Sequence, residues 1–266
     1  MSEQNIGFAG KLAVIVGGSK GIGKAVSIKL ATAGAEVVVV SRDAESGNAV
    51  CDEIRHTGGK ARWLRGDYLN SDEMQHVADT ISGEGGSCDI LVASGGPGYP
   101  RPKPFLETPI EDFSAFFSSR CIGRLYAVRA FAEQMRSKGY GKIVLLTTDA
   151  GRVPTPSEVL NGSAAAALVF ATRSLALELT RYGLRVNAVS TTVTTGTPSY
   201  ERYRAKVDAG QVDKIANVFS AIERKTPLGR LNTPEEVAEA VLFLCSEASD
   251  RISGAVLSVN GGLSVP

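Results

Sequence analysis

The sequence predicts an α/β protein built on a doubly wound parallel sheet of about seven strands, with helices on both faces. Strand-like apolar runs alternate with helix-like amphipathic segments along almost the whole chain. The strand-like runs are short and almost continuously apolar, which is typical of strands buried on both faces. No linker-like or repetitive stretch divides the 266 residues, so one domain spanning residues 1–266 is expected.

The first part of the chain alternates strictly between strands and helices. The runs LAVIVG and EVVVV are rich in β-branched residues, which favour strands. Apolar side chains at helical spacing follow the first of these runs. The strands are expected at 12–17, 36–40, 61–65 and 89–94, and the helices between them at 21–33, 44–57 and 71–82.

The second part continues the alternation with one interruption. Strands are expected at 142–147, 184–190 and 254–259, and helices at 110–138, 162–182 and 234–246. Repeated strand–helix–strand units of this kind give a parallel sheet. The segment 191–232 breaks the rhythm because its start is polar and turn-rich. An insertion after the carboxyl end of a strand suits a substrate lid, or equally an ordinary surface excursion.

Composition excludes several classes of protein. The net charge of +1 gives no bulk attraction to nucleic acid or to an anionic membrane. No apolar run is expected to span a bilayer, and the polar N-terminus lacks the pattern of a signal peptide. The scattered cysteines form no CxxC pair, which favours reduced thiols in a cytoplasmic protein. His56 and His76 fall in peripheral helices, and no residue cluster has metal-ligand spacing.

A glycine cluster, VGGSKGIGKAV (16–26), joins the first expected strand to the first helix. Gly17, Gly21 and Gly23 allow a sharp turn and a close approach of the backbone to a pyrophosphate. The helix that follows directs its N-terminal N–H groups at the phosphates. The position after the first strand of a βαβ series favours a dinucleotide site over a tight structural turn.

The spacing Gly-x-x-x-Gly-x-Gly resembles that of the short-chain dehydrogenase/reductase family, and the resemblance covers nearly the whole chain. RGDY, ASGG (93–96), SLALELTRYGLRVNAVS (174–190), GRLNTPEEVAEAVLFLCSEAS (229–249) and ISGAVLSVNGG (252–262) stand at or near the family's patterns. The resemblance implies a Rossmann-type sheet, a nicotinamide dinucleotide, and a homodimer or homotetramer formed through the long helices. It implies cofactor contacts from Gly17, Ser19, Lys20, Gly21, Ile22, Gly23, Ser41, Arg42, Asp67, Tyr68, Ser94, Gly95 and Gly96.

The end of the second strand indicates which dinucleotide is preferred. Enzymes that choose NAD often carry an acidic residue there, which accepts hydrogen bonds from the ribose hydroxyls. This chain has Ser41 and Arg42 at that place, with Lys20 in the glycine loop. Two cations suit a 2′-phosphate, so NADP is favoured over NAD. NAD stays open, as does a chain without dinucleotide in which Lys20 and Arg42 are solvated surface charges.

The chain resembles the family least at the catalytic positions. Family members use a Ser to orient the substrate carbonyl, a Tyr as general acid/base, a Lys four residues later and an Asn on the preceding long helix. Counted back from RVN (185–187), these positions fall on Thr148, Asn161, Ala165 and Arg120. Realignment cannot supply the missing pair, because no Tyr occurs between Tyr140 and Tyr182 and no Lys between Lys142 and Lys206.

Other groups could take over parts of this chemistry. Asn161 exchanges no proton at ordinary pH, but the Thr148 hydroxyl could still donate to a carbonyl oxygen. Arg120 could bind a substrate carboxylate or phosphate, or equally reach solvent or a neighbouring subunit. Substitute proton donors are Asp149, Glu158, Tyr99, Tyr200 and Tyr203, although each also suits a wall or surface position.

These observations predict an atypical oxidoreductase. It is expected to bind NADP(H) and to act on a small carbonyl or alcohol metabolite by a non-standard mechanism. A non-redox lyase, cyclase or isomerase on the same fold is an alternative, because the usual proton donor is missing. A pseudoenzyme that only binds the cofactor is a further alternative. The resemblance identifies no substrate, since function resides in the site.

Overall fold

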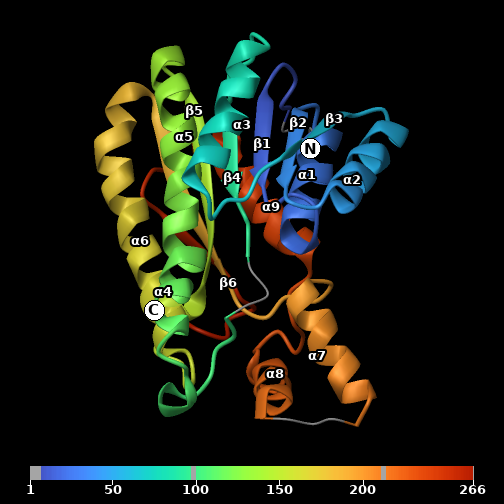
Figure 1. Cartoon of the computed structure of the whole chain (residues 1–266), viewed down its shortest axis with the longest axis vertical. Coiled ribbons are helices and arrows are strands. Elements are labelled where there is room, and N and C mark those ends of the chain that lie inside the picture. Colours follow the sequence, from blue (N-terminus) through green and yellow to red (C-terminus); the bar gives the residue numbers. More distant parts are fainter. Residues whose placement is uncertain (1–6, 97–99, 211–213, 266) are drawn as a thin grey trace.

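The computed structural model describes residues 7–96, 100–210 and 214–265, without the side chains of 214–218. Its centre is a seven-stranded parallel sheet in the order β3-β2-β1-β4-β5-β6-β7 (Figure 1). The order reverses between β1 and β4, so the carboxyl ends of these strands form the switch point of the sheet. The strands are β1 (Leu12–Val16), β2 (Glu36–Ser41), β3 (Lys60–Arg65), β4 (Ile90–Ala93), β5 (Gly141–Thr148), β6 (Leu184–Thr191) and β7 (Val256–Val259).

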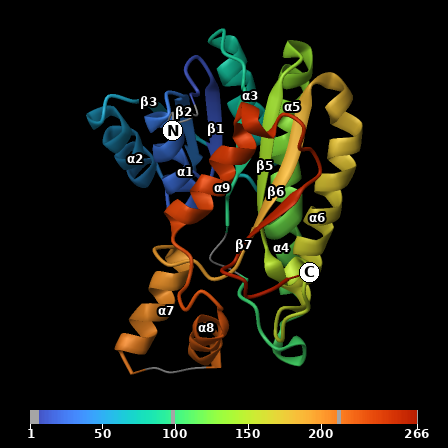
Figure 2. The ribbon, with the colours of Figure 1, turned by 180° about the vertical axis from the view of Figure 1, so that it is seen from behind.

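Helices cover both faces of the sheet. One face carries α1 (Gly21–Thr32), α2 (Ala44–His56) and α9 (Pro234–Cys245), and the other carries α3 (Ser71–Gly83), α5 (Gly123–Lys138) and α6 (Val159–Leu179) (Figures 1 and 2). Side chains alternate along each strand, so Val37 and Val39 enter one apolar cluster while Val38 and Val40 enter the other. The doubly wound parallel sheet predicted from the sequence is therefore confirmed.

The excursion after β6 contains two helices that were not expected from the sequence: α7 (Pro198–Asp208) and α8 (Lys214–Lys225). Thr197 begins α7 because its hydroxyl accepts a hydrogen bond from the N–H of Tyr200. The two ends of the excursion are joined, since the N–H of Thr195 donates to the Asn232 carbonyl at 2.9 Å. Both helices lie beyond the carboxyl ends of the strands (Figure 1).

The expectation of a single long helix at 110–138 is wrong, because the middle of this segment is not α-helical. A short helix, α4 (Asp112–Phe117), runs into a π-helical turn, η2 (Ser118–Ile122), before α5 begins. A π-turn shifts the backbone hydrogen bonds by one residue, and such turns occur frequently at functional sites. This turn carries Arg120, one of the candidate catalytic residues predicted from the sequence.

Arg124 supports the π-turn from inside the protein. Its Nη1 donates to the carbonyl oxygens of Ser119 at 2.8 Å and Arg120 at 3.1 Å, and its Nε donates to the carbonyl of Leu146 in β5 at 2.8 Å. The residue is only 6% exposed, and burial lowers the pKa of its guanidinium to about 10. The group stays charged at neutral pH and ties the π-turn to the sheet.

One helical segment corrects the expectation that no apolar run could span a bilayer. Val159–Tyr182, which is α6 with the 3₁₀ turn that follows it, is long and apolar enough by length and composition, the only such helix among the described residues. The helix packs on β5, β6 and the 3₁₀ turn η3 (Asp149–Gly151). It is therefore a core helix of the layered fold.

Replacing Arg124 with Met should destabilise the protein. The substitution removes the donor for three carbonyl oxygens and keeps a side chain of similar length. We expect the free energy of unfolding to fall by about 2–4 kcal/mol, measured by urea unfolding. Arg129, exposed on the same helix, provides the matched control, and Arg129→Met should change stability by less than about 0.5 kcal/mol. Equal effects of the two substitutions would contradict the role given to Arg124.

Candidate functional site

The glycine loop lies at the switch point of the sheet, where β1 and β4 end. Gly17 has a φ of +78°, and a Cβ added there would lie 2.5 Å from the Cα of Gly95 in the loop after β4. A Cβ on Gly23 would lie 2.1 Å from the carbonyl oxygen of Gly17. Both contacts are with backbone, so side chains at these positions could not be relieved by a rotamer change. The sequence therefore folds into a cradle that only glycine can form.

The N-terminus of α1 points its backbone donors into this cradle. Among the described residues, no side chain caps this helix, and its first turn carries no acidic residue. The first N–H groups of a helix have no partner within the helix, and they attract an anion. Ser19 and Ile22 flank this turn and are half-buried. The glycine contacts and the uncapped helix together fit the pyrophosphate of a dinucleotide.

Two exposed cations lie at the end of β2, near the cradle. Lys20 Nζ is 3.6 Å from a carboxylate oxygen of Asp43, and Arg42 Nη1 is 3.6 Å from a carboxylate oxygen of Asp67. Long, exposed pairs of this kind contribute at most about 1 kcal/mol, so an anion could displace them. The Ser41 hydroxyl is already engaged, because it accepts from the indole N–H of Trp63 at 2.9 Å and donates to the Asp43 carbonyl.

Tyr68 fills the space between the loop after β4 and the π-turn. A Cβ added to Gly95 would lie 2.8 Å from its ring, and one added to Gly123 would lie 2.5 Å from it. The phenol donates to the carbonyl oxygen of Ser119 at 3.4 Å, and burial raises its pKa. Ser94 and Gly96 flank this contact; Ser94 bonds its N–H to the Val16 carbonyl, and Gly96 is exposed.

Thr148 and Asp149 follow one another at the end of β5 but have different surroundings. Thr148 is half-buried and pairs with Thr191 of β6 in the sheet. The carboxylate of Asp149 is buried, where it accepts hydrogen bonds from Ser190 at 2.6 Å, Asn260 at 2.6 Å and Ser264 at 2.8 Å. Asp149 therefore fastens the C-terminal segment to β5, whereas Thr148 beside it is more accessible.

Arg120, Asn161 and Glu158 form a hydrogen-bonded chain at the start of α6. Arg120 Nε donates to the side-chain oxygen of Asn161 at 2.7 Å, and the amide nitrogen of Asn161 donates to the carboxylate of Glu158. Arg120 also donates to the Pro100 carbonyl at 3.3 Å. Its guanidinium is thus held between the start of α6 and the segment at Pro100.

The ionisation of this chain is set by burial. Burial raises the pKa of the Glu158 carboxyl, although the hydrogen bond from Asn161 and the charge of Arg120 act in the opposite direction. Burial also lowers the pKa of the Arg120 guanidinium. The outcome is a half-buried carboxyl that holds a proton more readily than an ordinary glutamate. Such a group can act as a general acid or base.

The small residues of α6 have an intramolecular role. A Cβ on Gly151 of η3 would lie 2.7 Å from the Cβ of Ala165, and one on Gly162 would lie 2.6 Å from the Ala150 carbonyl oxygen. Ala165 is fully buried against η3. The alanine-rich stretch is therefore needed for close packing of α6 on the end of β5.

The tyrosines suggested as substitute donors differ in their surroundings. Tyr203 is buried in the excursion, where its ring stacks on Phe219 with centroids 4.5 Å apart. Its hydroxyl bonds that of Ser220 at 3.0 Å, so it holds α7 to α8. Tyr200 packs beside Tyr203 at 5.8 Å. Tyr99 lies outside the described residues.

Sequence reasoning missed Arg124 and Ser157. Arg124 lies on the buried stripe of α5 that Val128 and Phe131 continue, and an arginine at this core spacing was a signal that could have identified it. Ser157 precedes Glu158 and has a φ of +65°, the one positive φ outside glycine among the described residues. Nothing in the sequence indicated that strain.

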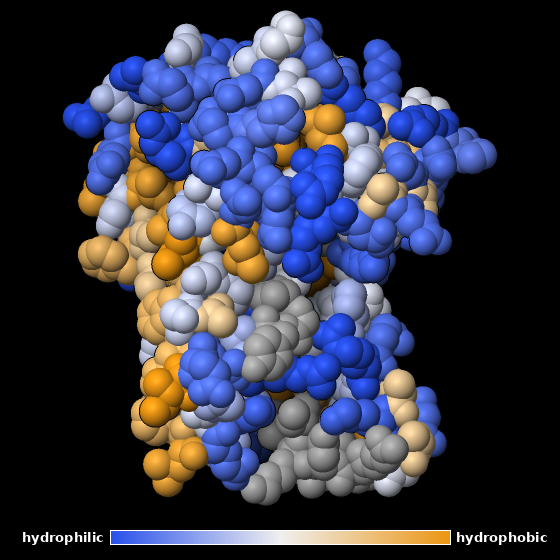
Figure 3. Space-filling view, viewed as in Figure 1, coloured by the Kyte–Doolittle hydropathy of each residue, from blue (hydrophilic) through white to orange (hydrophobic). Residues whose placement is uncertain are grey.

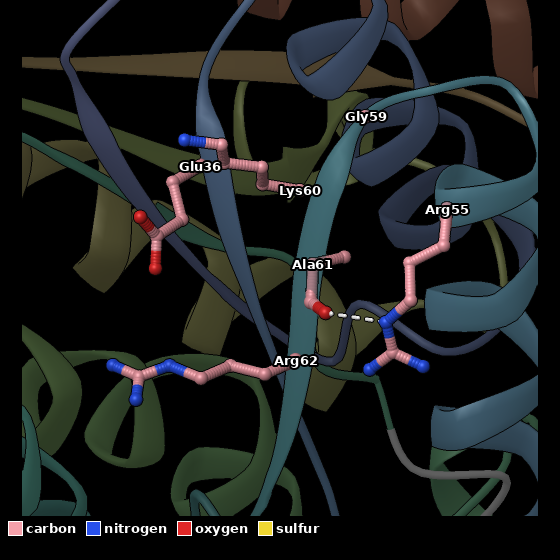
Figure 4. Close-up of a pocket in the computed structure, with 6 residues that line it drawn as sticks. All are labelled: Glu36, Arg55, Gly59, Lys60, Ala61 and Arg62. Atoms are coloured by element: carbon pink, nitrogen blue, oxygen red, sulfur yellow. Dashed lines mark hydrogen bonds between the residues drawn. The ribbon is translucent and has the colours of Figure 1, made fainter.

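A hollow lies at the amino ends of β2 and β3, away from the glycine cradle. It measures about 340 Å³ and is lined by Glu36, Arg55, Gly59, Lys60, Ala61 and Arg62 (Figure 4). Glu36 and Lys60 begin β2 and β3, whereas ligands of open α/β sheets bind at the carboxyl ends of the strands. Arg55 and Arg62 are already paired with Asp52 and Glu84. The switch-point edge therefore remains the candidate site.

Known proteins match this chain over nearly its full length. Residues 16–264 match the enoyl-(acyl carrier protein) reductase family model. The 7α-hydroxysteroid dehydrogenase of Escherichia coli (strain K12) is 32% identical over 98% of this chain and 97% of its own length. The cis-4-hydroxycyclohexanecarboxylate dehydrogenase of Sinomonas cyclohexanicum is 33% identical over 96% of this chain and 97% of its own.

A solved structure extends the likeness to three dimensions. The structure of 7α-hydroxysteroid dehydrogenase complexed with NADH and 7-oxo glycochenodeoxycholic acid has a TM-score of 0.87 at 32% identity. The match covers 98% of this chain and 97% of that chain. Sheet order, glycine cradle and full-length matches agree, and the chain belongs to the short-chain dehydrogenase/reductase family.

Proposed function

We propose that this chain is an oxidoreductase that binds NADP(H) and acts on a small alcohol or carbonyl compound without the family's usual Tyr and Lys. The observation that carries the proposal is the cradle in which Gly17 meets Gly95 beside the uncapped N-terminus of α1. In the single domain 1–266, the residues for the cofactor lie at the ends of β1, β2 and β4. Those for chemistry lie at the end of β5 and the start of α6.

The relatives support a ring-bearing secondary alcohol, or the corresponding ketone, as the substrate. Two of them are named for a hydroxysteroid and for a hydroxycyclohexanecarboxylate. Both compounds carry the reacting hydroxyl on a saturated ring. The segment 191–232 acts as the substrate lid, and a Cβ on Gly21 of the cofactor loop would lie 3.3 Å from the Thr197 side chain at the start of α7. The lid therefore begins beside the cofactor loop.

Lys20 and Arg42 supply the preference for NADP. Both are exposed and held only by long ion pairs, so each is free to turn to a 2′-phosphate. The solved relative with NADH shows that the family also accepts the unphosphorylated dinucleotide. Two cations at the ribose favour the phosphorylated form in this chain.

The chain's own residues orient the reacting oxygen. A bound nicotinamide supplies or accepts the hydride. The hydroxyl of Thr148 donates a hydrogen bond to the substrate oxygen, and this hydrogen bond strengthens as negative charge develops on that oxygen. Asn161 occupies the family's Tyr position, and its amide is held between Arg120 and Glu158. Orientation by these groups contributes to the rate even without the usual acid.

The exposed apolar face of α6 supports assembly into a homodimer or homotetramer of a cytoplasmic protein. Phe170 is 71% exposed and Leu177 is 84% exposed. Hydrophobic residues gather along the edge of the molecule where α5 and α6 lie (Figure 3). Contiguous apolar surface of this kind marks a protein interface.

A non-redox reaction on the same fold, or cofactor binding alone, is the second candidate. It is favoured by Asn161 and Ala165 at the positions where the family has its Tyr and Lys. An amide and a guanidinium can stabilise an enolate or another oxyanion without any hydride transfer. This candidate predicts turnover of a substrate, or tight dinucleotide binding, with no change in nicotinamide absorbance.

Arg42→Ala should weaken NADPH binding by roughly 10-fold to 100-fold, because a charge-assisted hydrogen bond to the 2′-phosphate is lost. Binding of NADH should be unchanged, since it lacks that phosphate. Isothermal calorimetry measures both constants. Arg55→Ala removes an exposed arginine outside the site and should alter neither. An equal loss for NADH and NADPH would overturn the assignment of Arg42.

Purified protein should oxidise NADPH in the presence of a cyclic ketone such as cyclohexanone or a 7-oxo bile acid. The change in nicotinamide absorbance, followed over a panel of ring ketones and alcohols, measures this activity. Gly23→Ala should abolish it together with dinucleotide binding, since the added Cβ meets the Gly17 carbonyl. Tight NADPH binding with no hydride transfer to any panel member would favour the second candidate.

Phe170→Glu together with Leu177→Glu should lower the oligomeric state, because two charges would be buried at the interface. Size-exclusion chromatography with light scattering measures the change. Leu106→Glu places a charge on another exposed leucine, in the 3₁₀ turn before α4, and should leave the mass unchanged. A double variant with the mass of the wild type would place the interface elsewhere.

A further inference from the structure

We propose that Glu158 is the proton donor and acceptor of this enzyme, held in position by Asn161 and, through it, by Arg120. The inference rests on the proposed redox function and assigns a residue of that site. Glu158 stands one helical turn before Asn161, which occupies the family's Tyr position. Its carboxylate accepts a hydrogen bond from the Asn161 amide. The carboxyl of Glu158 therefore lies beside the position at which family members carry the tyrosine phenol.

Backbone geometry supports the assignment independently. Ser157 adopts a φ of +65°, an unfavourable conformation for a residue with a side chain. This conformation immediately precedes Glu158, whose carbonyl accepts the N–H of Gly162 at 2.6 Å as α6 begins. Non-glycine residues in this conformation cluster at functional sites. Here the strained residue sets the direction in which the chain enters α6 and presents Glu158.

The hydrogen-bond chain orients the carboxyl without blocking it. The side-chain oxygen of Asn161 accepts from Arg120, which fixes the amide so that its nitrogen faces Glu158. Arg120 is in turn fixed by the π-turn and by the Pro100 carbonyl. Asn161 engages one carboxylate oxygen of Glu158, and no side chain among the described residues hydrogen-bonds to the other. Asn161 and Arg120 are accordingly positioning residues.

The electrostatic surroundings favour the protonated form of Glu158 more than water does. Burial raises the pKa of Glu158, and Arg120 is the charged side chain that opposes this rise. On the neighbouring turn η3, Asp149 is occupied by Ser190, Asn260 and Ser264. Glu158 is half-buried, so it can regain a proton from solvent after each turnover. A half-buried carboxyl with a raised pKa can give up a proton and regain it, as a general acid must.

The proton transfer balances as follows in the direction of reduction. The substrate carbonyl carbon accepts a hydride from a reduced nicotinamide dinucleotide, which is thereby oxidised. The π electrons of the C=O bond pass to the oxygen, and a new O–H bond forms with the proton of Glu158 as its own O–H bond breaks. Glu158 is left as a carboxylate hydrogen-bonded to Asn161. Oxidation of the alcohol runs the same steps backwards and requires the carboxylate form.

Glu158→Gln tests the assignment, because it keeps the size and hydrogen-bonding capacity of the side chain but cannot give a proton. We expect the maximal rate of ketone reduction to fall on the order of 100-fold or more. Binding of NADPH should change less than about 2-fold. Glu158→Asp should recover part of the rate. Glu178→Gln, an exposed position on the same helix, is the matched control and should behave like the wild type.

The pH profile gives a readout that a structural role would not move. Reduction needs protonated Glu158, so the wild-type rate should fall as pH rises through its raised pKa, and oxidation should rise over the same interval. This dependence should disappear in Glu158→Gln. Carbon-13 NMR of glutamate-labelled protein bound to NADP should show a carboxyl whose pKa lies above that of an ordinary glutamate, and this signal should be absent from Glu158→Gln.

The outcomes distinguish this inference from the proposed function. Turnover by the wild type that Glu158→Gln retains, with the same pH profile, would overturn the role of Glu158 and leave the oxidoreductase intact. A Glu158 carboxyl that titrates like a solvent-exposed glutamate would do the same. Absence of hydride transfer in the wild type, despite bound NADPH, would overturn the proposed function and with it the inference.

Discussion

The candidate site depends on the contact between the buried guanidinium of Arg124 and the carbonyl groups of the π-turn. Without those donors, the turn between α4 and α5 would leave polar groups unsatisfied inside the protein. The same side chain reaches the Leu146 carbonyl in β5, so one residue relates the π-turn to the strand that ends in Thr148. This contact fixes the position of Arg120. Arg120 donates to the side chain of Asn161, and Asn161 in turn donates to Glu158.

The two ends of the site differ in how far they depart from the family pattern. At the cofactor end, glycines meet backbone at distances that no side chain could tolerate, and an uncapped helix begins beside them. At the substrate end, the expected positions of the family's Tyr, Lys and Asn fall on Asn161, Ala165 and Arg120, and the half-buried Glu158 lies beside Asn161. Tyr68 lies between these ends, wedged between Gly95 and Gly123, and donates to the carbonyl of Ser119 in the π-turn.

The sheet and most helices could be predicted because their signals are local. Apolar, β-branched runs such as EVVVV specify buried strands, and the glycine spacing marks the first turn. Helix α7 could not be predicted, since the polar, turn-rich run before it shows no apolar periodicity. Helix α8 could have been predicted, because Ile215, Phe219 and Ile222 recur at helical spacing. The π-turn was also missed, because it is stabilised by a contact with a distant strand. The positive φ of Ser157 could not be predicted, because serine adopts this conformation rarely.

Glu158 was one of several candidate acids in the sequence, and the structure separates them by their partners. The carboxylate of Asp149 accepts three hydrogen bonds, and the ring of Tyr203 packs within the excursion. Glu158 alone among these described candidates is bonded to Asn161. A crystal structure of the protein with NADPH and a ring ketone tests the account most directly. It should show the ketone oxygen within about 3 Å of both the Thr148 hydroxyl and the Glu158 carboxyl. A ketone oxygen bound by other groups, with Glu158 turned away from it, would contradict the account.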